Sequence, residues 1–148
     1  MILTVLGVIA SLLVIVGGLT SSQAAVAKAP TQANLPPGCS KPAGGYLVIM
    51  SMYGYNDSML EGAGPSTPWP VIRVTQNTTV NITVCNADTA QAHGFQISNY
   101  FDSKVVALGP REVIHVSFIA TEVGNFRIYC AIFCTIHPFM NGELLVTP

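Results

Sequence analysis

Hydrophobic and polar positions alternate in short runs along most of the chain after residue 45. The clearest run is TVNITVC, in which Val80, Ile82 and Val84 face one side. Asn81 and Thr83 face the other side. Because successive side chains of a strand point to opposite faces, this period of two indicates a half-buried β-strand.

The same period recurs in further segments that Gly, Pro, Asn and Asp clusters separate: 46–52, 71–76, 94–98, 113–119, 126–130 and 143–147. No stretch after residue 30 shows helical periodicity. Short strands with turn residues between them at regular spacing are typical of Greek-key sandwiches and barrels. We therefore predict an all-β domain over residues 46–148.

An almost unbroken apolar run from Ile2 to Leu19 precedes the strands. As a helix it would be about 27 Å long, which is just enough to cross a bilayer. We expect a single-pass anchor over residues 1–20 in the cell membrane, with the rest of the chain on the extracytoplasmic side. The small residues of the following SSQAAVAKA have the spacing of a signal-peptidase site, so a cleaved leader is the alternative.

Between the apolar run and the first strand, residues 21–45 are rich in proline and contain paired glycines. Pro30, Pro36, Pro37 and Pro42 interrupt both helix and strand patterns. This segment is predicted to be a linker, which leaves residues 46–148 as the one folded domain.

Charge and motif content narrow the function of that domain. The 148 residues carry a formal net charge of −1 and only 6 Lys and Arg, so no basic patch is present to bind nucleic acid. The chain has no GxSxG elbow, no phosphate-binding glycine loop, and no paired carboxylates among its 7 acidic residues. These observations argue against a nucleic-acid partner and against a hydrolase.

The candidate chemistry lies in YCAIFCTIHPFM, which places Cys130, Cys134, His137 and Met140 in one short loop. Thiolate and thioether ligands favour copper, and imidazole suits it. Electron-transfer copper sites combine two histidines and a cysteine with a weak axial methionine. The loop supplies such a set except for the second histidine.

Only three histidines exist, so the second imidazole has few sources. His93 lies in AHGF, at the junction of a loop and a strand about 40 residues before the loop. Sheet pairing could bring it beside the final hairpin, so we predict His93 as the remaining ligand. His115 alternates with Ile114 and Val116 on a strand, where an ordinary strand histidine is expected.

Two other interpretations of the cysteine loop are open at this point. Cys130 and Cys134 could form a disulfide, although His137 and Met140 would then have no purpose and Cys39 with Cys85 offers a separate pair. A Cys₂His₂ set could bind zinc, although the methionine and the strand-rich core favour copper.

Taken together, these motifs make residues 46–147 resemble subunit II of haem-copper respiratory oxidases, a family that carries the binuclear CuA centre in a cupredoxin domain behind one or two transmembrane helices. The resemblance rests on AHGF, on LGPREVIHVSFIATEVGNFRIYC leading into the ligand loop, on the loop itself, and on the closing NGELLV. Tyr53 and Tyr55 in MYGYND are similar to the aromatic segment of that family.

The resemblance implies a cupredoxin fold and a role for each ligand. Cys130 and Cys134 would bridge two coppers, and His93 and His137 would each bind one of them. Met140 would be the weak axial ligand of one copper, and the backbone carbonyl of Ile132 would complete the other.

The loop departs from the family pattern at one place. The family has three residues between the second cysteine and the histidine, whereas only Thr135 and Ile136 separate Cys134 from His137. This shorter spacing is similar to the mononuclear blue-copper loop of amicyanin, which has no thiol at the place of Cys130. A mononuclear site would leave a free thiol beside copper and open to oxidation, so binuclear copper is favoured and a mononuclear type 1 site is the alternative.

For function, the resemblance implies a non-catalytic subunit through which electrons enter a cytochrome c oxidase-type complex. Its partners would be the haem-containing subunit I, a soluble donor such as cytochrome c or a small copper protein, and the membrane. The alternative is a membrane-tethered mononuclear blue-copper carrier. A copper-delivery or storage protein is a third hypothesis, which buried mixed ligands on a rigid loop disfavour.

Overall fold

The computed structural model describes residues 35–56, 68–100 and 106–148. The predicted anchor over residues 1–20 lies outside the described residues, as does the linker up to residue 34. Within the described ranges, no helix has the length and apolar character needed to cross a membrane.

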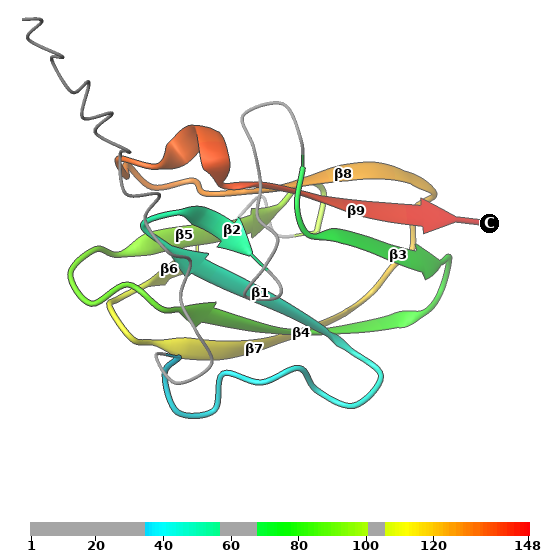
Figure 1. Ribbon diagram of the computed structural model, residues 1–148. Helices are drawn as coiled ribbons and strands as arrows, with labels where there is room; N and C mark the ends of the chain where they lie inside the picture. The colour runs from blue at the N-terminus through cyan, green and yellow to red at the C-terminus, as the bar shows by residue number, and fades with distance from the viewer. Residues whose placement is uncertain (1–34, 57–67, 101–105) are drawn as a thin grey trace, which may run out of the picture.

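The described residues fold into two sheets that stack face to face (Figure 1). One sheet has the order β2-β1-β4-β7 and the other β3-β9-β8-β5-β6. The strands are β1 (Tyr46–Ser51), β2 (Gly54–Asn56), β3 (Val71–Thr75), β4 (Thr79–Asn86), β5 (His93–Ile97), β6 (Val106–Leu108), β7 (Val113–Ile119), β8 (Gly124–Tyr129) and β9 (Asn141–Thr147). Both sheets are mixed, because β1 pairs in parallel with β4 and β3 in parallel with β9, whereas the other pairs are antiparallel.

The predicted all-β sandwich is therefore confirmed, and each predicted strand is present within one or two residues of its expected bounds. The sequence pattern missed β2 and β6. Each is only three residues long, which is too short to show a period of two.

The main core fills the space between the sheets. Val80, Ile82 and Val84 of β4 point into it, as their alternation predicts. Thr83 points to the opposite face but is also buried, and its hydroxyl lies 3.1 Å from Nδ1 of His115 on the neighbouring β7. The outer face of this sheet is thus partly covered, so β4 is buried on both sides over its second half.

A second, smaller core covers that outer face. Cys39, in the segment predicted as a linker, forms a disulfide with Cys85 of β4. Both cysteines are buried and pack with Ile49 of β1. The chain is therefore fixed to the sheet from Cys39 onward, while the division into a linker and a domain at residue 46 stays a prediction.

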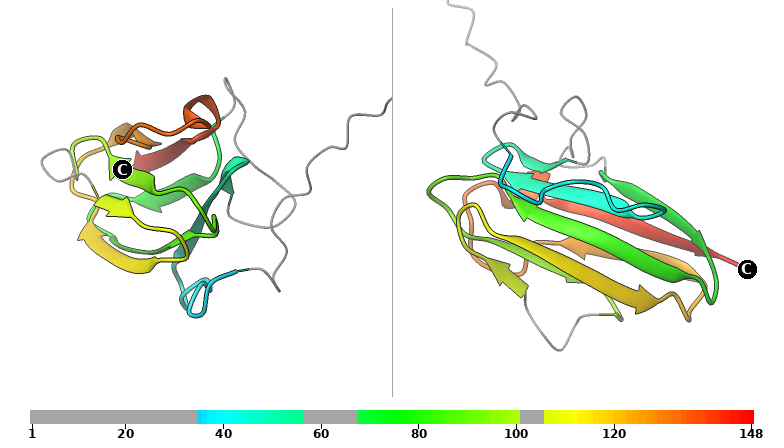
Figure 2. Two further views of the ribbon diagram at one scale, coloured as in Figure 1. Left: turned by 90° about the vertical axis from the view of Figure 1, so that its left-hand side faces the viewer. Right: turned by 90° about the horizontal axis from the view of Figure 1, so that it is seen from below.

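The connection from β8 to β9 lies at the end of the sandwich opposite the C-terminus (Figures 1 and 2). It contains one turn of 3-10 helix, η2 (His137–Phe139), which packs against β2. Since β2 belongs to the first sheet and β8 and β9 to the second, this end of the sandwich is closed by contacts between the two sheets.

Candidate metal centre

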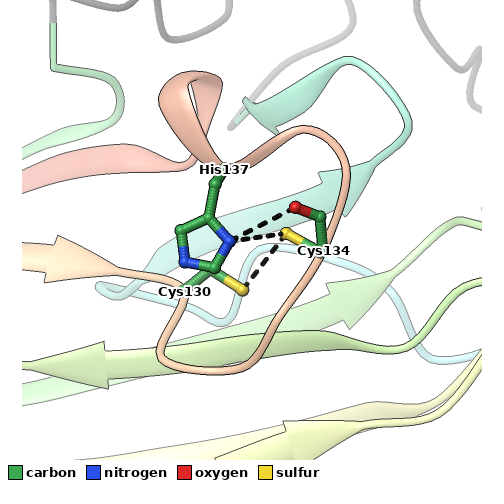
Figure 3. A group of neighbouring side chains, drawn as sticks. All are labelled: Cys130, Cys134 and His137. Carbon is green, nitrogen blue, oxygen red and sulfur yellow. Dashed lines mark hydrogen bonds between the residues drawn. The ribbon is translucent and has the colours of Figure 1, made fainter.

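The β8–β9 connection gathers three candidate ligands. The side-chain sulfurs of Cys130 and Cys134 and a ring nitrogen of His137 all lie within 4.8 Å of one another (Figure 3). The two sulfurs are 3.5 Å apart, and the Cys134 sulfur is 3.3 Å from Nδ1 of His137. Among the described residues this is the group of His, Cys, Asp and Glu side chains whose spacing fits a metal ion.

Both thiols of the loop are free and buried. The disulfide of the described residues joins Cys39 to Cys85 instead, which is the separate pair that the sequence offered. Cys130 begins the loop where β8 ends, and Cys134 follows after a turn that points its sulfur back toward Cys130. The loop thus places two thiols face to face without joining them.

The helical turn η2 orders the second half of the loop. Pro138 stands in its first turn, where the fixed φ of proline favours a helix start, and the N–H of Met140 donates to the carbonyl of His137. This turn brings the Met140 sulfur to 3.5 Å from the Cys134 sulfur. Met140 is completely buried and His137 is half-buried, so the thioether lies inside and the imidazole near the surface.

His93, the fifth predicted side chain, is the first residue of β5 and is completely buried. Its Nε2 lies 3.2 Å from a carboxylate oxygen of Asp88, whereas its Nδ1 has no hydrogen-bond partner. A buried polar atom without a partner is costly, and a metal ion is one of the few groups that would satisfy it. His93 is outside the tight group of three, but the next residue, Gly94, donates its N–H to the Cys130 sulfur at 3.1 Å.

Asp88 is a functional candidate that the sequence analysis missed. Its carboxylate accepts hydrogen bonds from the N–H groups of Ala90 and Gln91, and it faces His93. Burial raises the pKa of the Asp88 carboxyl, but the two N–H groups and His93 outweigh burial, and the pKa is lowered. An ionised Asp88 would hold the proton of His93 on Nε2 and leave Nδ1 as a lone-pair donor. The signal was a carboxylate in the turn just before a candidate ligand.

The remaining predicted atoms also have defined places. The carbonyl oxygen of Ile132, which the resemblance names as a backbone ligand, lies 3.3 Å from the Cys130 sulfur. His115 is on β7, exposed and paired with Thr83. It does not belong to the group of close ligand atoms.

The protonation of Cys134 follows from its surroundings. Burial, followed by the hydrogen bond to Cys130 and the nearby Cys130 charge, raises the pKa of the Cys134 thiol to about 11. At neutral pH this thiol is therefore protonated in the metal-free chain. A bound cation would have to displace that proton, since metals bind the thiolate.

The donor set fits copper. It offers two sulfurs, an available imidazole nitrogen on His137, the unpartnered Nδ1 of His93 and a buried thioether. Soft sulfur donors combined with imidazole are typical of copper sites, and a thioether is not among the usual ligands of zinc.

Comparison with known proteins agrees with this fold. No family model matches the chain. One similar solved structure is a haem-copper terminal oxidase dimer, with a TM-score of 0.53 and 17% identity over 74% of this chain and 72% of that chain. Another is the periplasmic domain of cytochrome oxidase subunit II, CoxB, of Bradyrhizobium japonicum, with a TM-score of 0.53 and 16% identity over 69% of this chain and 82% of that chain. A reduced auracyanin from Roseiflexus castenholzii also matches, with a TM-score of 0.49 and 16% identity over 69% of this chain and 95% of that chain.

The described part of the chain therefore has the cupredoxin fold. Within that class, the resemblance to oxidase subunit II is confirmed at the level of the fold. The Cys130, Cys134 and His137 group is consistent with a site of the CuA kind.

Proposed function

We propose that this chain is an electron-transfer copper protein, the CuA-type subunit II of a haem-copper terminal oxidase. The observation that carries the proposal is the pair of free, buried thiols 3.5 Å apart, with an imidazole nitrogen 3.3 Å from one of them. The cupredoxin fold that the chain shares with an oxidase subunit II domain supports the assignment.

In this proposal His93, Cys130, Cys134, His137 and Met140 hold the metal, with the carbonyl of Ile132 as a further donor. When bound, copper supplies reversible one-electron oxidation and reduction. The sulfurs of the loop are buried, and β2 and β5 contact the loop from the rest of the sandwich. A site held in this way would change little on electron transfer, which suits a carrier.

Two coppers are favoured over one by the place of Cys130. Its sulfur is buried beside Cys134, accepts a hydrogen bond from Gly94 and faces the Ile132 carbonyl. A mononuclear site on Cys134 would leave this second sulfur next to the metal without a role, although Cys134 alone contacts both His137 and Met140. A tethered mononuclear blue-copper carrier is accordingly the second candidate function.

The loop surface suits contact with a redox partner. His137 is half-buried, and the neighbouring Phe133 is 96% exposed. From Cys130 to Met140 the loop contains no Asp, Glu, Lys or Arg. We propose that a soluble donor, cytochrome c or a small copper protein, docks here through apolar contact, and that the chain passes electrons to haem in subunit I.

The proposal places the domain on the extracytoplasmic side of the cell membrane, held by a helix over residues 1–20. The apolar run from Ile2 to Leu19 supports this anchor, and the Cys39–Cys85 disulfide suits an oxidising compartment.

The test is to purify the full chain from membranes and determine its metal content and its companions. The proposal predicts two coppers per chain and co-purification with a haem-containing subunit. In the variant C130S we expect the copper content to fall toward one or none. One copper per chain in the wild type, with no haem subunit, would favour the tethered carrier.

A further inference from the structure

Tyr55 of β2 is a completely buried phenol beside the candidate metal centre and is not one of the proposed ligands. Its hydroxyl donates a hydrogen bond of 2.7 Å to the backbone carbonyl of Gly94 on β5. Because β2 and β5 belong to different sheets, this bond crosses the sandwich at the end where the loop lies. Burial, followed by the nearby charges of Cys130 and Cys134, raises the pKa of Tyr55 well above its usual value, so the phenol remains a neutral donor.

Gly94 is held on both sides of its Cα. Its carbonyl accepts from Tyr55, and its N–H donates to the Cys130 sulfur at 3.1 Å. The pairing of β5 with β8 includes Gln96 and Ile97 but does not extend to Gly94. On its other edge β5 pairs with β6, where Gly94 lies opposite Ala107. Beyond the end of the pairing with β8, the carbonyl and N–H of Gly94 are satisfied by a tyrosine and a thiol.

The fit around Gly94 is tight. A Cβ at this position would lie 2.9 Å from the backbone nitrogen of Ala131 and 3.3 Å from the Cys130 sulfur. β2 also approaches the loop from the other side, since a Cβ on Gly54 would collide with the backbone of Phe139 in η2. A small movement of β2 or of Gly94 would therefore displace the loop that carries the ligands.

We propose that Tyr55 is a positioning residue of the metal centre, whose hydroxyl fixes Gly94 so that the Gly94 N–H donates to the Cys130 sulfur. This role rests on the function proposed above. A hydrogen bond to a metal-bound sulfur withdraws electron density from it and favours the reduced metal, which is one way in which proteins set a reduction potential. Tyr55 would thus raise the potential of the site without touching the metal.

The experiment compares the full-length variant Y55F with the matched control Y46F. Tyr46 also donates its hydroxyl to a backbone carbonyl, that of Arg73 at 2.8 Å, but Arg73 lies on β3, which contributes no ligand. In copper-loaded Y55F we expect a lower reduction potential and a sulfur-to-copper absorption band at longer wavelength. In Y46F both should equal the wild type.

A second readout does not need copper. In the metal-free chain we expect the Gly94 amide proton of Y55F to exchange with solvent about tenfold faster than in the wild type or Y46F, as for the loss of one buried hydrogen bond. If the chain binds no copper, the proposed function fails, but this exchange rate still tests the link from Tyr55 to Gly94.

A variant with 3-fluorotyrosine at position 55 guards against a folding defect in Y55F. It keeps the hydroxyl and nearly the same volume but is a stronger donor, so the potential should shift upward instead of downward. Unchanged potential and unchanged Gly94 exchange in Y55F, or an unchanged potential with 3-fluorotyrosine, would overturn the positioning role.

Discussion

Removing the Cys39–Cys85 disulfide should strongly destabilise the metal-free chain. The two cysteines are 46 residues apart, and closing a loop of that size in the unfolded chain corresponds to about 4 kcal/mol in the chain-entropy treatment. The bond also lies in a core of its own, with Ile49 and Cys85 almost completely buried. The double variant C39A/C85A should therefore lose about 4 kcal/mol, and somewhat more for the lost packing of two sulfurs.

For a domain of about this size, such a loss lowers the Tm by roughly 12–20 °C. The assay is thermal and urea unfolding of the metal-free chain, followed by circular dichroism. The matched control is C130A/C134A, which also replaces two buried cysteines by alanine but breaks no covalent bond. Its loss comes from packing and from hydrogen bonds such as that of the Gly94 N–H to the Cys130 sulfur, about 1–3 kcal/mol together, and should stay below that of C39A/C85A. Equal stability of the two double variants would refute the reasoning.

Three further predictions concern the metal loop. In D88N, His93 loses the carboxylate that faces its Nε2, so the affinity for copper should fall about 10- to 100-fold. The affinity is measured by competition with a chelator, and the control T89A, at the adjacent exposed position, should bind copper as the wild type does. The pKa of the Cys134 thiol is higher in the folded chain than in the unfolded chain, so this thiol contributes stability below its unfolded pKa. That contribution is lost as the pH rises through the folded pKa of about 11. Urea unfolding of the metal-free chain between about pH 8 and 11 should show this loss of stability in the wild type and a smaller loss in C134A. In F133A, whose side chain is 96% exposed, the unfolding free energy should change by less than about 0.5 kcal/mol, while stopped-flow electron transfer from the donor slows severalfold; an unchanged rate would remove Phe133 from the docking surface.

Much of the fold could be predicted because its strands carry their own signal. The alternation of Val80, Ile82 and Val84 with polar residues directly reports which face of β4 meets the main core. The burial of Thr83 could not be predicted from that pattern, because it depends on neighbours such as His115, which is distant in sequence and reaches β4 only through strand pairing.

The candidate metal centre was likewise predictable only in part. Cys130, Cys134, His137 and Met140 lie within one loop, so their spacing alone indicates a common centre. The sequence suggested His93 by elimination, and the structure adds the observation that its Nδ1 is buried without a partner.

The supporting residues were harder to foresee. Gly94 contacts the site through a backbone N–H, which leaves no motif, and the sign of Asp88 in the sequence is only a carboxylate five residues before His93. Tyr55 lies on a three-residue strand that the pattern did not reveal, and its contact with Gly94 exists only once the two sheets are stacked.

Electron paramagnetic resonance of the copper-loaded full chain tests the central claim most directly. If Cys130 and Cys134 bridge two coppers that share one unpaired electron, coupling to two equivalent copper nuclei gives a seven-line signal. The account predicts that signal, and it predicts its disappearance in C130S. A four-line signal from a single copper, unchanged in C130S, would show that Cys130 is not a ligand and would contradict the binuclear centre.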